Sequence, residues 1–80
     1  MKIIPEEIHW IREDLAMKSG ESRDYLVRIR YRQPLQKATL YHSDQGIYIT
    51  FEEPQRGVAP GQFAAWYDDR ELIGSGVIHT

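Results

Sequence analysis

The segment VRIRYR, residues 27–32, constrains the fold of this chain more than any other feature. Apolar side chains alternate in it with three arginines: Val27, Ile29 and Tyr31 in one set, and Arg28, Arg30 and Arg32 in the other. Because successive side chains of a strand point to opposite faces, the pattern predicts a strand over residues 25–32 with one buried and one solvated face. Pro34 is expected to end it, since proline cannot donate to a strand ladder.

Four later segments carry similar strand signals and are separated by turn residues. We expect strands over residues 37–42, 47–51, 63–67 and 72–79. The inward-facing side chains are expected to include Ala38, Leu40, Ile47, Ile49 and Phe51. Residues 43–46 read as a hairpin turn with Gly46 at positive φ, and residues 19–24 read as a loop.

The first residues admit two interpretations. Pro5 followed by two glutamates resembles a helix start, with Gly20 as a plausible end. Residues 8–11, IHWI, are β-branched and aromatic and read equally well as a short strand. The local pattern leaves residues 1–24 open between strand, helix and loop.

Short strands at this density in an 80-residue chain predict one all-β domain over residues 1–80, either a small antiparallel barrel of about six strands or a sandwich. Gly74 and Gly76 within the last strand favour a barrel, because a glycine inside a strand marks a bulge or a sharp bend. Trp10 and Trp66 are expected to anchor the core, each with one hydrogen-bond partner for its indole nitrogen.

The composition narrows the classes of function. The chain contains no cysteine, so disulfides, thiolate metal sites and cysteine nucleophiles are excluded within it. No apolar run approaches the ~20 residues that span a bilayer, so we expect a cytoplasmic location without membrane association. A formal net charge of −2 does not exclude nucleic-acid binding, because a local basic stripe is enough for it.

No catalytic or metal-binding constellation stands out. The three histidines lack ligand spacing, and the acidic pairs fall at segment ends, where solvated carboxylates are expected. Ser75 lies in a Gly-Ser-Gly triplet that lacks the longer nucleophile elbow, and no glycine-rich phosphate loop is present. We therefore expect that the chain on its own is not an enzyme and holds no metal.

The alternating arginines are the strongest candidate for a ligand contact. Residues i and i+2 of a strand lie roughly 6–7 Å apart, so successive guanidinium groups could reach successive phosphates. Lys37 could extend this patch, and Tyr41 or Tyr48 could stack on a base. The alternative is a solvated strand face whose arginines pair with glutamates across the sheet.

A second candidate lies in the loop before residue 63. Pro60-Gly61 fits the centre of a type II turn, where glycine accepts positive φ at low cost. Gln62 could hydrogen-bond the backbone of this turn or reach toward RNA, and Arg56 lies in the same loop. The stretch reads first as a corner that closes the barrel.

The order of three motifs gives a resemblance to a known family. IHWI, then VRIRYRQ, then FEEPQRGVAPGQFAAWYDDRELIGSGVI resembles the C-terminal β-barrel of the bacterial tRNA-specific 2-thiouridylases over residues 8–78. The resemblance implies that residues 8–11 form a strand. The chain departs from the family pattern at His9, at Ser75, where a third glycine is usual, and in the bulky run at residues 63–66.

The resemblance implies an accessory role. The family's enzymes adenylate a wobble uridine of tRNA with ATP in an N-terminal domain, and a cysteine pair then delivers sulfur from a persulfide donor. This chain has neither part, so it looks like a non-catalytic, excised C-terminal domain of a longer enzyme that helps to hold tRNA. Its candidate RNA contacts are Arg28, Arg30, Arg32, Lys37, Arg56 and Gln62.

The resemblance also allows a docking role without RNA. The barrel would then pack on neighbouring domains of the same enzyme or on a sulfur-relay protein. This alternative predicts an exposed apolar patch that includes Trp66 or Tyr67.

Overall fold

The computed structural model describes residues 1–30 and 32–79, which form seven strands and two short 3-10 helices. The strands are β1 (Lys2–Ile3), β2 (Ile8–Trp10), β3 (Ser22–Arg28), β4 (Gln36–Ser43), β5 (Gly46–Phe51), β6 (Phe63–Asp68) and β7 (Glu71–Val77). The 3-10 helices are η1 (Pro5–Glu7) and η2 (Glu13–Leu15). Tyr31, expected to face the core, lies outside the described residues. No helix in the two described ranges is long and apolar enough to cross a bilayer.

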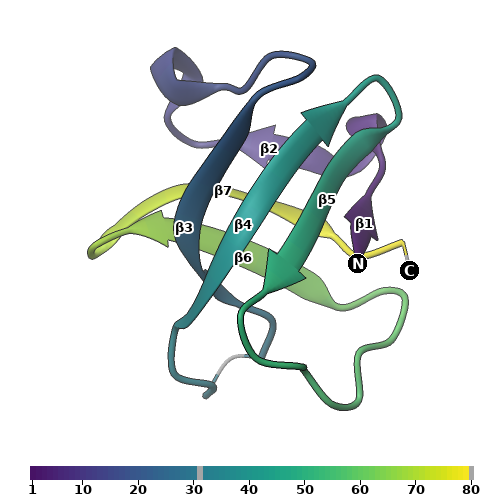
Figure 1. Cartoon of the computed structure of the whole chain (residues 1–80), viewed down its shortest axis with the longest axis vertical. Coiled ribbons are helices and arrows are strands. Elements are labelled where there is room, and N and C mark those ends of the chain that lie inside the picture. The colour runs from purple at the N-terminus through teal and green to yellow at the C-terminus, as the bar shows by residue number, and fades with distance from the viewer. Residues whose placement is uncertain (31, 80) are drawn as a thin grey trace.

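All the strands belong to one antiparallel sheet in the order β1-β5-β4-β3-β6-β7-β2. The strands β1 and β2 form the two edges of the sheet, yet in the chain they are separated only by the short η1 turn. The two edges therefore lie near each other, and the sheet rolls up (Figure 1). Beyond the end of β7, the N–H of His79 donates to the carbonyl of Lys2 at 2.8 Å and links the two sides. The predicted all-β antiparallel barrel is confirmed, with β1 as a short additional strand.

The strand predictions hold for most of the chain and need correction around β3. This strand begins at Ser22, inside the predicted loop, because Ser22 to Asp24 pair with β4, and Asp24 accepts a 2.7 Å hydrogen bond from Thr39. It ends at Arg28, because the backbone then bends and the Gln33 side chain accepts the N–H of Ile29 at 3.0 Å. The prediction from alternation alone therefore placed the end of this strand too late in the sequence.

The N-terminal ambiguity resolves into short elements. Residues 8–10 form β2 and pair with β7, as the family resemblance implied. Pro5 begins a helical turn, as its position suggested, but the turn lasts only three residues. The glutamates of this turn are exposed, so no apolar face stabilises a longer helix there.

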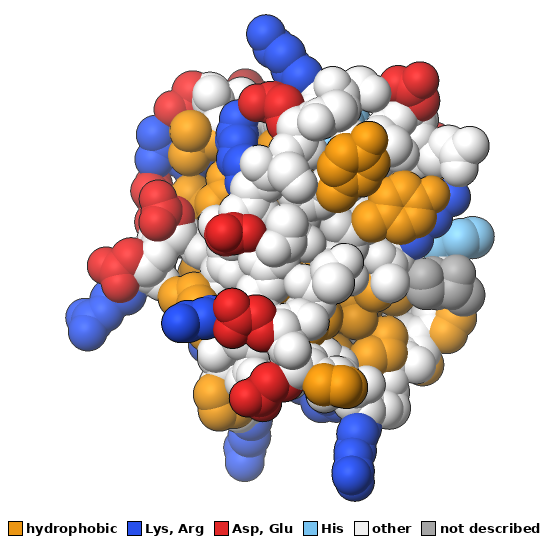
Figure 2. Space-filling model, in the orientation of Figure 1, with side chains coloured by type: hydrophobic (Ala, Val, Ile, Leu, Met, Phe, Trp, Pro, Cys, Tyr) orange, Lys and Arg blue, Asp and Glu red, His pale blue; other side chains and the backbone are white. Residues whose placement is uncertain are grey.

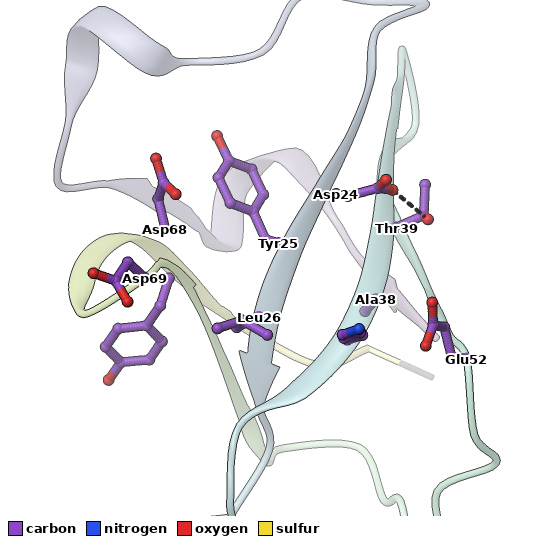
Figure 3. Close-up of a pocket in the computed structure, with 10 residues that line it drawn as sticks. Asp24, Tyr25, Leu26, Ala38, Thr39, Glu52, Asp68 and Asp69 are labelled. Carbon is purple, nitrogen blue, oxygen red and sulfur yellow. Dashed lines mark hydrogen bonds between the residues drawn. The ribbon is translucent and has the colours of Figure 1, made fainter.

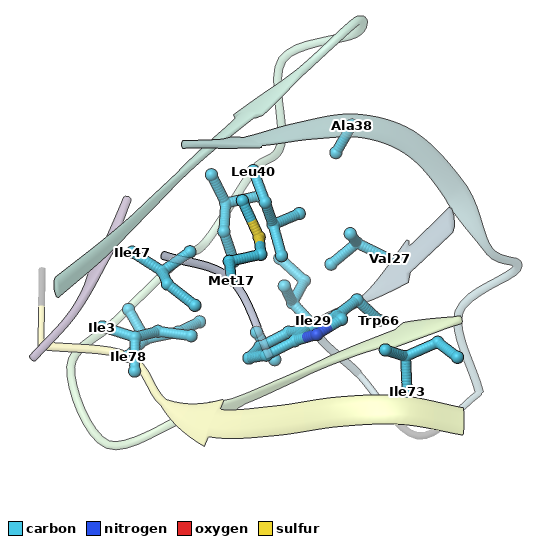
Figure 4. Close-up of a cluster of buried hydrophobic side chains, with 12 residues drawn as sticks. Ile3, Met17, Val27, Ile29, Ala38, Leu40, Ile47, Trp66, Ile73 and Ile78 are labelled. Carbon is cyan, nitrogen blue, oxygen red and sulfur yellow. The ribbon is translucent and has the colours of Figure 1, made fainter. Parts of the chain in front are cut away.

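The core is a single cluster of buried apolar side chains. Figure 4 shows them pointing into the space between the two sides of the rolled sheet. The buried residues are Ile3, Met17, Val27, Ile29, Ala38, Leu40, Ile47, Ile49, Ala64, Trp66, Ile73 and Ile78. Among the described residues that were predicted to face inward, Phe51, at the end of its strand, is half-buried and the others are buried. Gly46 has the expected positive φ, 127°.

Trp66 occupies the centre of this cluster with no solvent exposure. The half-buried ring of Trp10 packs edge-on against it, with ring centroids 5.5 Å apart and planes at 72°. Both tryptophans thus take part in the core, as predicted. The expected partner of the indole is missing for Trp66, whose Nε1 is buried without a hydrogen bond among the described residues.

Both glycines of β7 are required, because other parts of the chain lie too close to their Cα atoms to leave room for a Cβ. A Cβ at Gly74 would lie 2.7–2.8 Å from three atoms of the Trp66 indole. A Cβ at Gly76 would lie 2.6 Å from the side chain of Ile3 and 2.8 Å from the carbonyl of Glu7. A register shift also occurs here, since Trp66 pairs with Gly74 whereas Tyr67 pairs with Leu72. The predicted bulge therefore lies beside Gly74.

An exposed ion-pair cluster connects η2 to β7. Arg12 donates to both carboxylate oxygens of Asp14, at 2.9 and 2.7 Å, and to Glu71 at 2.6 Å. These hydrogen bonds hold the pKa of Asp14 below its ordinary value and raise the pKa of Arg12. The cluster holds the segment after β2 against the start of β7.

We predict that Gly74→Ala destabilises the protein by about 1–3 kcal/mol through overpacking, because the fully buried Trp66 ring cannot move away. Urea unfolding would measure the loss, with Ser75→Ala as the neighbouring control. Replacing Trp66 by phenylalanine as well should make the double variant more stable than the sum of the single effects predicts. Strict additivity would contradict the proposed contact.

We also predict that Arg12→Gln raises the pKa of Asp14 toward its ordinary value, as measured by NMR titration of the carboxyl group. Glu71→Gln is the control, because it leaves both bonds between Arg12 and Asp14 in place. The folded pKa of Asp14 is the lowered one, so its stabilising contribution is full at neutral pH and is lost as the pH falls through that folded value. An unchanged pKa in Arg12→Gln would contradict this assignment.

Candidate nucleic-acid interface

A surface groove lies between the end of β3 and the outer face of β6. We call it the arginine groove. Its lining residues are Arg28, Ile29, Arg30, Gly61, Gln62, Phe63, Ala65 and Tyr67. Three of the six predicted contact residues, Arg28, Arg30 and Gln62, therefore share one concave surface.

Arg28 is the last residue of β3 and lies opposite Ala65 of β6. Because Ala65 is short, the guanidinium crosses the strand diagonally and its Cζ lies 5.6 Å from the centre of the Tyr67 ring. This is a cation–π arrangement, which holds the charge in place without neutralising it. Within the described part of the chain, no carboxylate forms an ion pair with Arg28.

Arg30 lies in the bend that follows β3, and its Nη2 donates to the backbone carbonyl of Arg56. The contact is close enough that a side chain at Gly57 would meet the same nitrogen, at 2.9 Å. It brings the loop over residues 52–62 against the groove, with the side chain of Arg56 exposed. Arg30 also has no ion-pair partner among the described carboxylates.

Gln62 builds the turn at the edge of the groove. Its side-chain oxygen accepts a hydrogen bond from the N–H of Ala59 at 2.9 Å, and its backbone carbonyl accepts one from the N–H of Ile78 at 2.7 Å. Gly61, with φ of 93°, donates to the carbonyl of Ile78 at 2.9 Å. The predicted bonding of Gln62 to the turn backbone is thus confirmed.

Three predicted contacts are not among the lining residues of the arginine groove: Arg56, in the loop that Arg30 contacts, and Arg32 and Lys37. Arg32 is exposed in the turn after β3 and is not among the lining residues, so the three arginines do not share one strand face as predicted. The reason is the early end of β3 at Arg28. Lys37 lies on β4 opposite Leu26 and lines a different groove.

We call this second surface the acidic groove. Figure 3 shows Asp68 and Asp69 on the β6–β7 turn at one side of it, and Asp24 and Glu52 at the other. In Figure 2, red Asp and Glu side chains are frequent on the left of the molecule, over β3 and this turn. Lys37 therefore shares its groove with four acidic residues, a setting that disfavours contact with phosphate. In the described ranges, no three His, Asp or Glu side chains are placed to hold a metal ion.

The tyrosines that were expected to stack on a base lie elsewhere. Tyr41 and Tyr48 are cross-strand partners on β4 and β5, 45% and 36% exposed. Tyr41 also pairs with Ser22 at the start of β3, whereas Arg28 ends that strand, about 20 Å away at the usual rise per residue. Neither tyrosine therefore lies beside the arginines.

Sequence reasoning missed Phe63, which is 66% exposed and lines the arginine groove. The signal was present in the alternation of β6. If Trp66 points into the core, Phe63, Ala65 and Tyr67 must point outward. Of the two residues that the docking alternative offered for an exposed patch, Trp66 is fully buried and Tyr67 is half-buried.

The other arginines with resolved contacts serve the structure. Arg23 donates to the carbonyl of Leu15 at 2.5 Å and to Glu21 at 3.3 Å. Glu21 also accepts the N–H of Lys18, and this bond is the main cause that lowers its pKa. Arg12 and Arg23 thus have carboxylate partners, whereas the two arginines of the groove have none among the described residues.

Comparison with known proteins places the chain in a family. The chain is 58% identical over 72 residues to the tRNA-specific 2-thiouridylase MnmA of Flavobacterium johnsoniae, which covers 90% of this chain and 18% of the relative. Identity is 53% over 76 residues with the same enzyme of Christiangramia forsetii, and 46% over 71 residues with that of Karelsulcia muelleri. The chain thus spans 18–19% of the length of these relatives. The matched segments make up 89–95% of this chain.

A family model described as the aminomethyltransferase beta-barrel domain matches residues 1–78. This match covers nearly the whole chain and agrees with the rolled antiparallel sheet. The resemblance drawn from the order of the motifs is confirmed by it. The chain belongs to the family of aminomethyltransferase beta-barrel domains, and it is similar to a part of the tRNA-specific 2-thiouridylases.

Proposed function

We propose that this chain is a non-catalytic accessory domain of an ATP-dependent enzyme that thiolates the wobble uridine of tRNA, and that it contacts tRNA through the arginine groove. The relatives are named as tRNA-specific 2-thiouridylases and are about five times longer than the chain. ATP and the persulfide sulfur donor would act on other parts of the enzyme. The domain would then position the RNA, in the cytoplasm, beside its neighbouring domains.

The main support for the proposal is a pair of arginines that form no ion pair with any carboxylate of the described residues. Arg28 and Arg30 line one groove, and none of its lining residues is acidic. Guanidinium groups suit phosphate because they are planar, permanently charged and able to donate two parallel hydrogen bonds. Arg56, held beside Arg30 by the loop contact, would add charge at the rim.

The acidic groove supports one orientation of the RNA. Tyr67 lines both grooves, so the two surfaces of opposite charge are neighbours. A polyanion would be attracted to one side of this residue and repelled from the other. In this arrangement Lys37 contributes little to binding, and Gln62 acts through the turn that it stabilises.

The docking alternative has weaker support. It was based on exposure of Trp66 or Tyr67, and Trp66 is fully buried. The guanidinium of Arg28 lies over the Tyr67 ring, so that ring offers little free apolar surface. Of the large apolar side chains in this groove, only Phe63 is strongly exposed among the described residues, and one ring is a small site for a partner protein.

We predict that Arg28→Gln with Arg30→Gln weakens tRNA binding by the chain about tenfold or more at low salt. The slope of log affinity against log salt should fall by about 1.5, because two phosphate contacts no longer release counterions. Fluorescence anisotropy with labelled tRNA at several salt concentrations would measure both quantities.

The matched control is Arg70→Gln combined with Arg12→Gln, which removes the same charge away from the groove. If the control weakened binding as much as the groove variant, the effect would reflect net charge and the proposed site would be wrong. Unchanged binding in the groove variant would also contradict it.

A further inference from the structure

We infer that the arginine groove binds an unpaired nucleotide of RNA, with its base stacked on Phe63 and its phosphate at Arg28. The inference rests on the proposed function, since it assumes that the groove contacts RNA. It adds the form of RNA that the groove accepts and the residue that recognises it.

Phe63 is the most exposed large apolar side chain in the described ranges, at 66%. It is not needed in the core, because Ala64 and Trp66 are the residues of β6 that point inward. A single exposed phenylalanine is common on protein surfaces and by itself indicates nothing. Its position is informative because two arginines line the same groove and neither forms an ion pair with a described carboxylate.

The backbone that carries Phe63 is held firmly. Phe63 pairs with Val77 across the β6–β7 ladder. The residue before it is bonded through its carbonyl to Ile78 and through its side chain to Ala59. A ring on so fixed a backbone is ready to stack, because little conformational freedom is lost when the ligand binds.

The groove has a free aromatic face at one end and a fixed charge at the other. Phe63, Ala65 and Tyr67 share the outer face of β6, and Arg28 covers the Tyr67 ring at 5.6 Å. No aromatic or cationic partner of Phe63 is found among the described residues, so its ring remains available. The short side chain of Ala65 leaves room between the free ring and the guanidinium.

This combination matches the chemistry of a nucleotide, which carries a flat aromatic base beside a negative phosphate. The base must be unpaired and unstacked, since in a duplex both of its faces are covered by neighbouring bases. Proteins that bind single-stranded nucleic acid use the same pairing of an aromatic platform with a positively charged groove. A duplex could reach Arg28 and Arg30 through its phosphates, but could not use Phe63.

The test compares a short single-stranded RNA carrying 2-aminopurine, a fluorescent adenine analogue that reports stacking, with a blunt-ended, fully paired RNA duplex of equal phosphate number. Phe63→Ala should weaken binding of the single strand roughly ten- to hundredfold and should abolish its fluorescence quenching. Binding of the duplex should change little. Phe63→Tyr should retain single-strand binding, whereas Phe63→Leu, which is apolar without an aromatic face, should not.

Tyr41→Ala is the matched control, because it removes an exposed aromatic ring far from the groove and should leave both RNAs bound as in the parent. Urea unfolding would confirm that each variant is folded, which the exposure of Phe63 makes the expected result. Arg28→Gln with Arg30→Gln should weaken both RNA forms.

The outcomes separate the two proposals. If the arginine variant loses affinity and Phe63→Ala binds the single strand like the parent, stacking is wrong and the proposed function stands. If neither variant changes binding, both are wrong. If Phe63→Ala lost affinity equally for the single strand and the duplex, the stacking role would be wrong. If AMP bound as tightly as the single strand, the ligand would be a free nucleotide and not RNA.

Discussion

The packing of the Trp66 indole against the backbone of Gly74 is the contact on which the rest of the structure depends. Any Cβ at Gly74 would overlap the ring, so the two strands can lie this close only with glycine there. The same ring receives the edge of Trp10 from β2, the outermost strand of the sheet. One buried side chain thus holds an edge strand and the middle of the sheet together. Gly76 has the corresponding role toward Ile3 of β1, the other edge.

The same contact decides what the outer surface presents. Because strand side chains alternate, a Trp66 that points inward turns Phe63, Ala65 and Tyr67 outward. The arginine groove is therefore the reverse side of the core, built on a paired strand. Its second wall comes from the bend after β3 and is held to the long loop by the contact of Arg30 with Arg56. A binding surface on such a scaffold keeps its geometry without a ligand.

Charge is divided over the surface in a way that the net value of −2 conceals. The acidic groove and the arginine groove share Tyr67 and differ in the sign of the charges that line them. Asp68 and Asp69 on the β6–β7 turn, together with Asp24 and Glu52, repel a polyanion from one side. The position of two or three arginines is thus more informative for function than the total charge.

From the amino-acid pattern we could predict the all-β class, the strands from β4 onward, the inward residues Leu40 and Ile49, the turns at Gly46 and Gly61, and the family. These features are local, or follow from motif order, so pattern and turn chemistry are sufficient to predict them. Three other features became visible only in the folded chain: β3 ends at Arg28, Lys37 shares its groove with acidic residues, and Phe63 lines the same groove as the arginines. Each of these depends on which strands become neighbours when the sheet rolls up, and this pairing is set by long-range packing around Trp66, which local alternation does not encode.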